Sequence, residues 1–268
     1  MTVITPPGML SASAGIFWRN QLHLRRRPAM VVAILTDPIV FTVLIGFVFG
    51  GSLGGQAYRE YMVAGLFTQA AIFTASYTAV GLSLDLEDGM VDRFRTLPIP
   101  RLAVLAGRTT SDLVNRSASL AMTALCGLAV GWRPHTGPLE IAGAFALCLL
   151  FAFAMSWIGA FVALVTPNVQ VATSLGLFWL FPASFVSSGF VVTTTLPGPL
   201  QAVADWSPVS GLGNSMRALF GNPPPPGYQV PHGWAAQHPI TYTVCACALL
   251  IILFAALSVW RYRRRTNR

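Results

Sequence analysis

Long apolar stretches, separated by short polar segments, are the dominant pattern of the chain. They cover residues 29–51, 61–84, 103–131, 139–165, 169–192 and 239–260. A helix rises about 1.5 Å per residue, so about 20 apolar residues cross the hydrocarbon core of a bilayer. The pattern therefore predicts an all-α integral membrane protein with six transmembrane helices.

The composition indicates that lipid surrounds most of the chain. Hydrophobic residues make up 54% of the 268 residues and charged residues 10%, whereas a soluble domain carries about 25% charged residues. All 17 basic residues are arginine, and a Walker A phosphate loop needs a lysine. The chain therefore lacks such a loop, and any ATP hydrolysis must come from a partner.

The placement of the arginines predicts how the helices are oriented. With the N-terminus in the cytoplasm, 14 of the 17 arginines lie on the cytoplasmic side, and Arg59, Arg133 and Arg217 lie outside. Basic residues are enriched in cytoplasmic loops. Both termini are therefore predicted in the cytoplasm, with residues 261–268 as a cytoplasmic tail. The apolar stretch after Arg27 is longer than a typical signal-peptide core, so it is interpreted as the first span.

Two connecting segments are longer than simple turns. Residues 85–101 form a charged loop on the cytoplasmic side, between the second and third spans. Residues 193–238 form a long outer segment before the last span, with consecutive prolines at 223–226. Because proline interrupts helices, this segment is predicted to be a capping or re-entrant segment. One or two short helices are expected between residues 200 and 220.

The charged loop carries the most specific motif of the chain. An acid-Gly-x-x-Asp-Arg pattern followed by Thr-x-Pro is formed by Asp88, Gly89, Asp92, Arg93, Thr96 and Pro98. It resembles the loop between the second and third spans of ABC type-2 permeases. The stretch DRFRTLPIPR is similar to the daunorubicin-resistance group of drug-efflux permeases, and residues 12–28 are similar to the family's N-terminal interfacial helix. Ser207-Pro208 is a small departure, because the family more often has Asn-Pro there.

The resemblance implies a function and a set of partners. Permeases of this family pair as two identical or two related chains, and each pair binds two cytoplasmic ABC ATPase subunits that hold ATP and Mg. The chain itself is then expected to bind no cofactor, metal or nucleic acid and to have no catalytic residue. We expect residues 1–268 to form one transmembrane domain. It would export a hydrophobic small molecule, such as a drug, antibiotic or lipid, across a bacterial plasma membrane.

The inner loop of this family forms a coupling helix that inserts into the ATPase. The residues expected to couple on this basis are Glu87, Asp88, Gly89, Asp92, Arg93, Phe94, Arg95 and Pro98. Acids early and bases late suit the dipole of a short helix, and Phe94 suits an apolar groove on a partner. The alternative interpretation is a solvated charged loop that only follows the arginine bias.

Three charged residues lie near the cytoplasmic end of the third span. Arg108, Asp112 and Arg116 are spaced four residues apart, so they share one helical face and can form a ladder of ion pairs. We expect this ladder to brace the coupling loop against the membrane part. The alternative is a plain surface salt bridge worth less than about 1 kcal/mol.

Asp37 is an acidic residue inside the first span. A charge at the centre of a transmembrane helix costs roughly 2.5–3.5 kcal/mol on insertion scales, so Asp37 needs a partner or water. One interpretation pairs it with an arginine at the inner rim of the membrane. The other places it against a cationic drug or in proton coupling.

Aromatic and small residues of the fifth span are candidates for a substrate path. They are Phe178, Trp179, Phe181, Ser184 and Ser187. Aromatic rings stack on flat apolar molecules, and hydroxyls add a few polar contacts. The alternative is that these side chains pack inside the protein or face lipid.

The same residues fit three other functions less well. Export of a lipid-linked glycan or lipo-oligosaccharide would need a wide polar channel, and the spans are strongly apolar. A secondary transporter would carry several ionisable groups near the membrane midplane, where Asp37 alone comes close. A membrane enzyme is disfavoured because the outer acids Glu60, Glu140 and Asp205 are far apart in sequence.

Overall fold

The computed structural model describes residues 9–26, 28–52, 55–89, 101–190, 196–224 and 233–266. Within these residues every regular element is a helix, which confirms the all-α prediction. The helices are α1 (Met9–Arg25), α2 (Pro28–Ser52), α3 (Gly55–Glu87), α5 (Arg101–Val130), α6 (Pro138–Val165), α7 (Val169–Phe185), α8 (Gly198–Asp205), α9 (Pro208–Phe220), α10 (Trp234–Gln237) and α11 (Pro239–Thr266).

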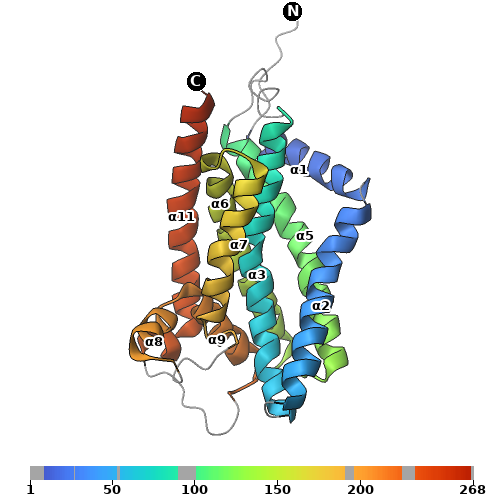
Figure 1. Cartoon of the computed structure of the whole chain (residues 1–268), viewed down its shortest axis with the longest axis vertical. Helices are drawn as coiled ribbons and strands as arrows, with labels where there is room; N and C mark the ends of the chain where they lie inside the picture. Colours follow the sequence, from blue (N-terminus) through green and yellow to red (C-terminus); the bar gives the residue numbers. More distant parts are fainter. Residues whose placement is uncertain are drawn as a thin grey trace, which may run out of the picture.

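The long helices form a bundle with α3 near its centre. Helices α2, α3, α5, α6, α7 and α11 run along the long axis of the molecule (Figure 1). Helix α1 lies across one end of the bundle, and the C-terminal end of α11 is at that same end (Figure 1). Helices α8 and α9 lie at the opposite end, in the segment where one or two short helices were expected.

Four helices of the described chain are long and apolar enough to cross a bilayer. They contain the stretches Tyr58–Glu87, Leu105–Val130, Pro138–Val165 and Pro239–Tyr262. Helices α2 and α7 contain shorter apolar stretches, Ile34–Gly46 and Val169–Phe185. The described chain therefore contains four candidate membrane spans by length and composition, and six spans remain a prediction.

Helix α7 ends earlier than the apolar pattern predicts. The last apolar stretch before the outer segment was expected to be helical to residue 192, but the helix ends at Phe185 and residues 186–190 form turns. The Ser187 hydroxyl donates to the carbonyl of Ser184 and accepts from the N–H of Gly189 at 3.1 Å. Such local serine bonds compete with the helical ladder, so they end the helix within an apolar run.

The core is built on close packing of α3 against α6. A Cβ at Gly159 on α6 would lie 2.1 Å from the carbonyl oxygen of Ala75 on α3, so glycine allows the two backbones to touch. Toward the end that carries α9, Phe67 packs against the rings of Trp132 and Phe220, with centroids 5.7 and 5.4 Å away. These contacts hold α3, α6 and α9 together as a rigid frame.

Arg217 on α9 joins this frame, although the arginine pattern predicted it simply on the outer side. Its side chain is buried, and its guanidinium lies 3.7 Å from the ring centroid of Tyr61 on α3. It donates to the carbonyls of Ser188 and Gly189 in the turn that follows α7, and to Asn214 Oδ1 at 3.2 Å. Within the described chain it forms no ion pair with an acid. Arg217 therefore ties α9 to α3 and to the end of α7.

Candidate functional site

A cavity of about 520 Å³ lies between four of the long helices. Its lining comes from α2 (Ile34, Asp37, Phe41), α3 (Phe73, Thr74, Ser76, Tyr77, Val80, Gly81, Leu84), α5 (Arg108, Asp112, Asn115, Arg116) and α7 (Thr173, Leu177, Phe181). We call this space the lateral cavity. Its wall is largely apolar and aromatic, and its charged side chains come from α5 and from Asp37 on α2.

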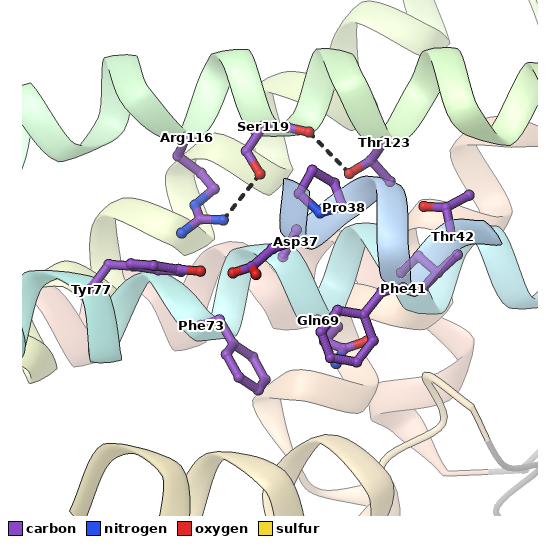
Figure 2. A pocket seen from close by; sticks show the side chains of 12 residues that line it. Asp37, Pro38, Phe41, Thr42, Gln69, Phe73, Tyr77, Arg116, Ser119 and Thr123 are labelled. Carbon is purple, nitrogen blue, oxygen red and sulfur yellow. Dashed lines mark hydrogen bonds between the residues drawn. The ribbon is translucent and has the colours of Figure 1, made fainter. Parts of the chain in front are cut away.

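A narrow pocket of about 40 Å³ adjoins the lateral cavity, because the two spaces share Asp37, Phe41, Phe73, Tyr77 and Arg116. Figure 2 shows these side chains, with Asp37 between the guanidinium of Arg116 and the ring of Phe73. One acid and one base from different helices thus face the same space.

Asp37 is placed in this space by α2. It precedes Pro38, which lies inside the helix and is buried. Within the described residues Asp37 forms no ion pair at 4.0 Å or less. Arg27, Arg93 and Arg95 lie outside the described residues, so the expected pairing with an arginine at the inner rim stays a prediction. The carboxylate is an acid inside an apolar span, and it faces the lateral cavity.

Arg116 lies opposite on α5 and is 8% exposed. Its guanidinium carbon is 5.0 Å from the ring centroid of Tyr77 on α3, and its Nη1 donates to Ser119 Oγ at 3.3 Å. The Nε atom has no hydrogen-bond partner in the described part of the chain. Arg116 is therefore buried and only partly satisfied by protein groups.

One of the two expected ion pairs of the ladder, between Arg108 and Asp112, is present. Arg108 Nε lies 3.5 Å from Asp112 Oδ1 on the same helix, but Arg116 forms no ion pair with Asp112 among the described residues. Instead Arg108 Nη1 lies 2.6 Å from Asp85 Oδ2 in the last turn of α3. Thr78 Oγ1 donates to Asp112 Oδ2 at 2.8 Å. The ladder thus extends from α5 to α3, where the charged loop begins.

Two further contacts fit this ion-pair network into the bundle. Arg19 of α1 lies 3.6 Å from the second carboxylate oxygen of Asp85. Gly81 on α3 leaves room for Arg108, because a Cβ there would lie 1.7 Å from the Arg108 Nη2 atom. The network of Asp85, Arg108 and Asp112 therefore ties α1, α3 and α5 together at one end of the lateral cavity. Its bracing role stays a prediction.

Replacing Arg108 with alanine is expected to destabilise this end of the bundle. Asp85 and Asp112 would keep their charges without their main partner, and the three side chains are only 18%, 25% and 13% exposed. Loss of one member of a mostly buried pair costs about 2–4 kcal/mol, which lowers the melting temperature by about 5–10 °C. Thermal melting of the purified protein measures this, with the exposed Arg25→Ala as control. Equal melting of both variants would show that the network carries no stability.

The predicted coupling residues lie partly inside the described chain. Glu87 ends α3, and its carboxylate accepts a hydrogen bond from the N–H of Val169 at 2.8 Å, so it caps the start of α7. An acid at this position also suits the helix dipole. Asp88 and the left-handed Gly89 (φ 66°) form the turn after α3, and glycine suits such a helix end. Asp92, Arg93, Phe94, Arg95 and Pro98 lie outside the described residues.

The predicted path residues of α7 occupy different surroundings. Phe181 lines the lateral cavity and packs edge-on against Phe73 at 5.2 Å between centroids. Phe178 is 79% exposed and is not part of the cavity wall, and Trp179 packs against the core. Ser184 and Ser187 are buried, and the hydroxyl of Ser187 bonds to backbone groups. Of these residues only Phe181 lines the lateral cavity, and it does so together with Asp37 of α2, the other predicted path residue.

Comparison with known proteins identifies the relatives of the chain. Residues 14–220 match the family model described as ABC-2 type transporter. The chain is 30% identical over 258 residues to a daunorubicin resistance ABC transporter permease protein of Streptomyces coeruleorubidus, covering 96% of this chain and 87% of the relative. It is 26% identical over 150 residues to a doxorubicin resistance ABC transporter permease protein of Mycobacterium tuberculosis, covering 52% and 51% of the two chains. A putative transport permease of Porphyra purpurea is 21% identical over 207 residues, covering 75% and 71%.

Proposed function

Because the chain belongs to the ABC-2 type transporter family, we propose that it is the membrane-spanning permease subunit of an ATP-driven exporter. It moves hydrophobic small molecules, such as a drug, an antibiotic or a lipid, out of the cell. A separate ABC ATPase hydrolyses the ATP. The names of the daunorubicin and doxorubicin resistance relatives support a drug as the transported molecule.

The lateral cavity is the observation that carries this proposal. Small-molecule sites are concave, mostly apolar and about 300–1,000 Å³ in volume, with a few placed polar groups. The cavity of about 520 Å³ has this size, and Phe41, Phe73, Tyr77 and Phe181 give it an aromatic wall. Such a wall favours a lipophilic molecule over a glycan. Asp37 adds an acid that attracts a basic group of the substrate.

The assembled exporter contains more than this chain. Helices α2 and α7 complete six spans in the bacterial plasma membrane, and both termini lie in the cytoplasm. Two permease chains, identical or related, pair with two ATPase subunits, which hold ATP and Mg. The loop after α3 inserts into the ATPase through Asp88, Gly89, Asp92, Arg93, Phe94, Arg95 and Pro98.

The contacts at the end of α3 support a route from this loop to the cavity. Asp85 holds Arg108, which lines the cavity, and Glu87 caps α7, which carries Phe181. A displacement of the loop therefore pulls on two walls of the lateral cavity. Through these contacts Arg108 and Asp112 brace the loop, and Glu87 links it to α7.

Filling the lateral cavity is expected to block transport. Thr173 on α7 lines the cavity, so Thr173→Trp places an indole in the space that the substrate needs. Leu175, on the same helix, is 44% exposed and lies outside the cavity wall, so Leu175→Trp is the matched control. We expect Thr173→Trp to reduce drug-stimulated ATPase activity of the assembled transporter roughly tenfold, because a bulky ring overlaps the site. Normal efflux by Thr173→Trp would remove the cavity from the substrate path.

A further inference from the structure

Arg116 is a buried cation that the proposed function does not use. It lies on α5, it lines both the lateral cavity and the adjoining narrow pocket, and it is 8% exposed. Its protein partners are Ser119 Oγ and the face of Tyr77, and its Nε has no hydrogen-bond partner in the described chain. A guanidinium is a fixed fork of N–H donors that suits a carboxylate or another planar oxygen group. Arg116 is therefore ready to accept such a group from a ligand.

Asp37 supplies the opposite charge across the same space. Both residues line the lateral cavity and the narrow pocket, and Figure 2 shows them facing each other beside Tyr77. Within the described residues no ion pair at 4.0 Å or less joins them. The two other charged residues of the cavity wall, Arg108 and Asp112, contact each other directly at 3.5 Å. Asp37 and Arg116 thus face each other as neighbouring opposite charges without a direct ion pair.

The charge balance of the cavity selects the class of ligand. Its wall carries two acids, Asp37 and Asp112, and two bases, Arg108 and Arg116, so its formal charge is zero. A plain cation or a plain anion would add an uncompensated charge to an apolar, membrane-embedded space, which is costly. A molecule that carries both charges can meet both poles and leave the balance unchanged.

We propose that Asp37 and Arg116 are the two poles of a binding site for a zwitterionic aromatic amphiphile. Its cationic group lies against the carboxylate of Asp37, and its carboxylate or equivalent oxygen group meets the guanidinium of Arg116. Its ring system lies against Phe41, Phe73 and Phe181, which line the same space. This assignment rests on the proposed function, because it takes the lateral cavity as the substrate site.

Two dyes with the same ring system test the assignment. Tetramethylrhodamine with a free carboxylate is a zwitterion, and its methyl ester is a cation. Fluorescence polarisation measures the binding of each dye to the wild-type transporter in lipid nanodiscs. We expect the free acid to bind roughly tenfold more tightly than the ester, a difference of about 1.4 kcal/mol, because the ester cannot form a charge-assisted hydrogen bond with Arg116. Equal binding of the two dyes to the wild type overturns the proposal without any variant.

Single substitutions then test the role of Asp37 and of Arg116 in dye binding. Arg116→Gln is expected to weaken binding of the free acid roughly tenfold. It is not expected to weaken binding of the ester, because the loss of the Arg116 charge removes a like charge that faces the cationic dye. Asp37→Asn is expected to weaken both dyes, and the exposed Arg25→Gln neither. If Arg116→Gln weakens both dyes equally, the residue is structural and the assignment is wrong. If Arg116→Gln restores ester binding to the Asp37→Asn variant, the two residues serve each other and no ligand site exists between them.

The same measurement separates this assignment from the proposed function. If Thr173→Trp abolishes binding of both dyes but the wild type shows no preference, the lateral cavity is the substrate site and only the zwitterion assignment fails. If both dyes stimulate the ATPase and Thr173→Trp changes neither stimulation, the lateral cavity is not the substrate site. The zwitterion assignment then fails, whereas the ATP-driven exporter stands. If neither dye nor any lipophilic drug stimulates the ATPase, the proposed function itself fails.

Discussion

Replacing Gly159 with alanine is expected to destabilise the folded protein by about 3 kcal/mol, because overpacking a tight contact costs 1–3 kcal/mol or more. The new Cβ would lie 2.1 Å from the carbonyl oxygen of Ala75 and 2.9 Å from its carbonyl carbon. These are backbone atoms, so no side-chain rotation relieves the clash. Helices α3 and α6 must move apart, and the core cluster around Phe67 and Phe151 lies between them.

Gly143, on the same helix, provides the matched control. A Cβ there would meet its nearest atom, Leu219 Cδ2, at 4.0 Å, which is ordinary contact. Gly143→Ala is therefore expected to keep or slightly raise stability, since alanine favours a helix by up to about 1 kcal/mol over glycine. Thermal melting followed by size-exclusion chromatography compares the two variants. If both melt like the wild type, the close approach of α3 and α6 is not as tight as described.

Replacing Arg217 with methionine is expected to loosen the attachment of α9 to α3 and to the turn after α7. Methionine fills a similar volume but cannot donate, so the carbonyls of Ser188 and Gly189 lose their bonds from the guanidinium. The Ser188 carbonyl keeps a hydrogen bond from the Tyr61 hydroxyl at 3.2 Å, but the Gly189 carbonyl loses its donor, and a buried acceptor left unsatisfied costs about 1–3 kcal/mol. The contact of the guanidinium with the ring of Tyr61 is lost as well. We expect the variant to be about 2–4 kcal/mol less stable than the wild type.

Lysine at position 217 refines this test. It keeps the charge but lacks the planar fork, so it can serve one carbonyl well and not both. The expected order of melting temperatures is wild type, then Arg217→Lys, then Arg217→Met, with the exposed Arg25→Met unchanged. A variant Arg217→Met that melts with the wild type would mean that α9 is held by its apolar contacts alone.

The apolar pattern predicts most helices closely because their ends coincide with a change in composition. The stretch 139–165 corresponds to Pro138–Val165, and 103–131 corresponds to Arg101–Val130. The end of α7 could not be predicted in this way. Local bonds from serine hydroxyls end that helix inside an apolar run, and hydropathy does not report side-chain bonding.

The sequence predicts those contacts of the candidate site that depend only on the spacing of residues along one helix. Arg108 and Asp112 form a contact because they are four residues apart, and Asp37 stands out as an acid in an apolar span. Contacts between helices are different. Asp85 and Arg108 are 23 positions apart in the chain, and Glu87 is 82 positions from the N–H that it caps. The buried Arg217 donates to carbonyls 28 and 29 positions away. Only the packed bundle brings such residues together.

The ATPase activity of the assembled transporter tests whether the chain works as the permease subunit of an ATP-driven exporter. The chain is co-expressed with a candidate ABC ATPase subunit and reconstituted in lipid nanodiscs, and vanadate-sensitive ATP hydrolysis is measured with and without a lipophilic drug. We expect drug-stimulated hydrolysis for the wild type. The loop variant Phe94→Ala/Arg95→Ala should lose this stimulation although both subunits still co-purify. If no ATPase co-purifies and an ion gradient alone drives drug transport by the chain, the chain is a secondary transporter and not the permease of an ATP-driven exporter.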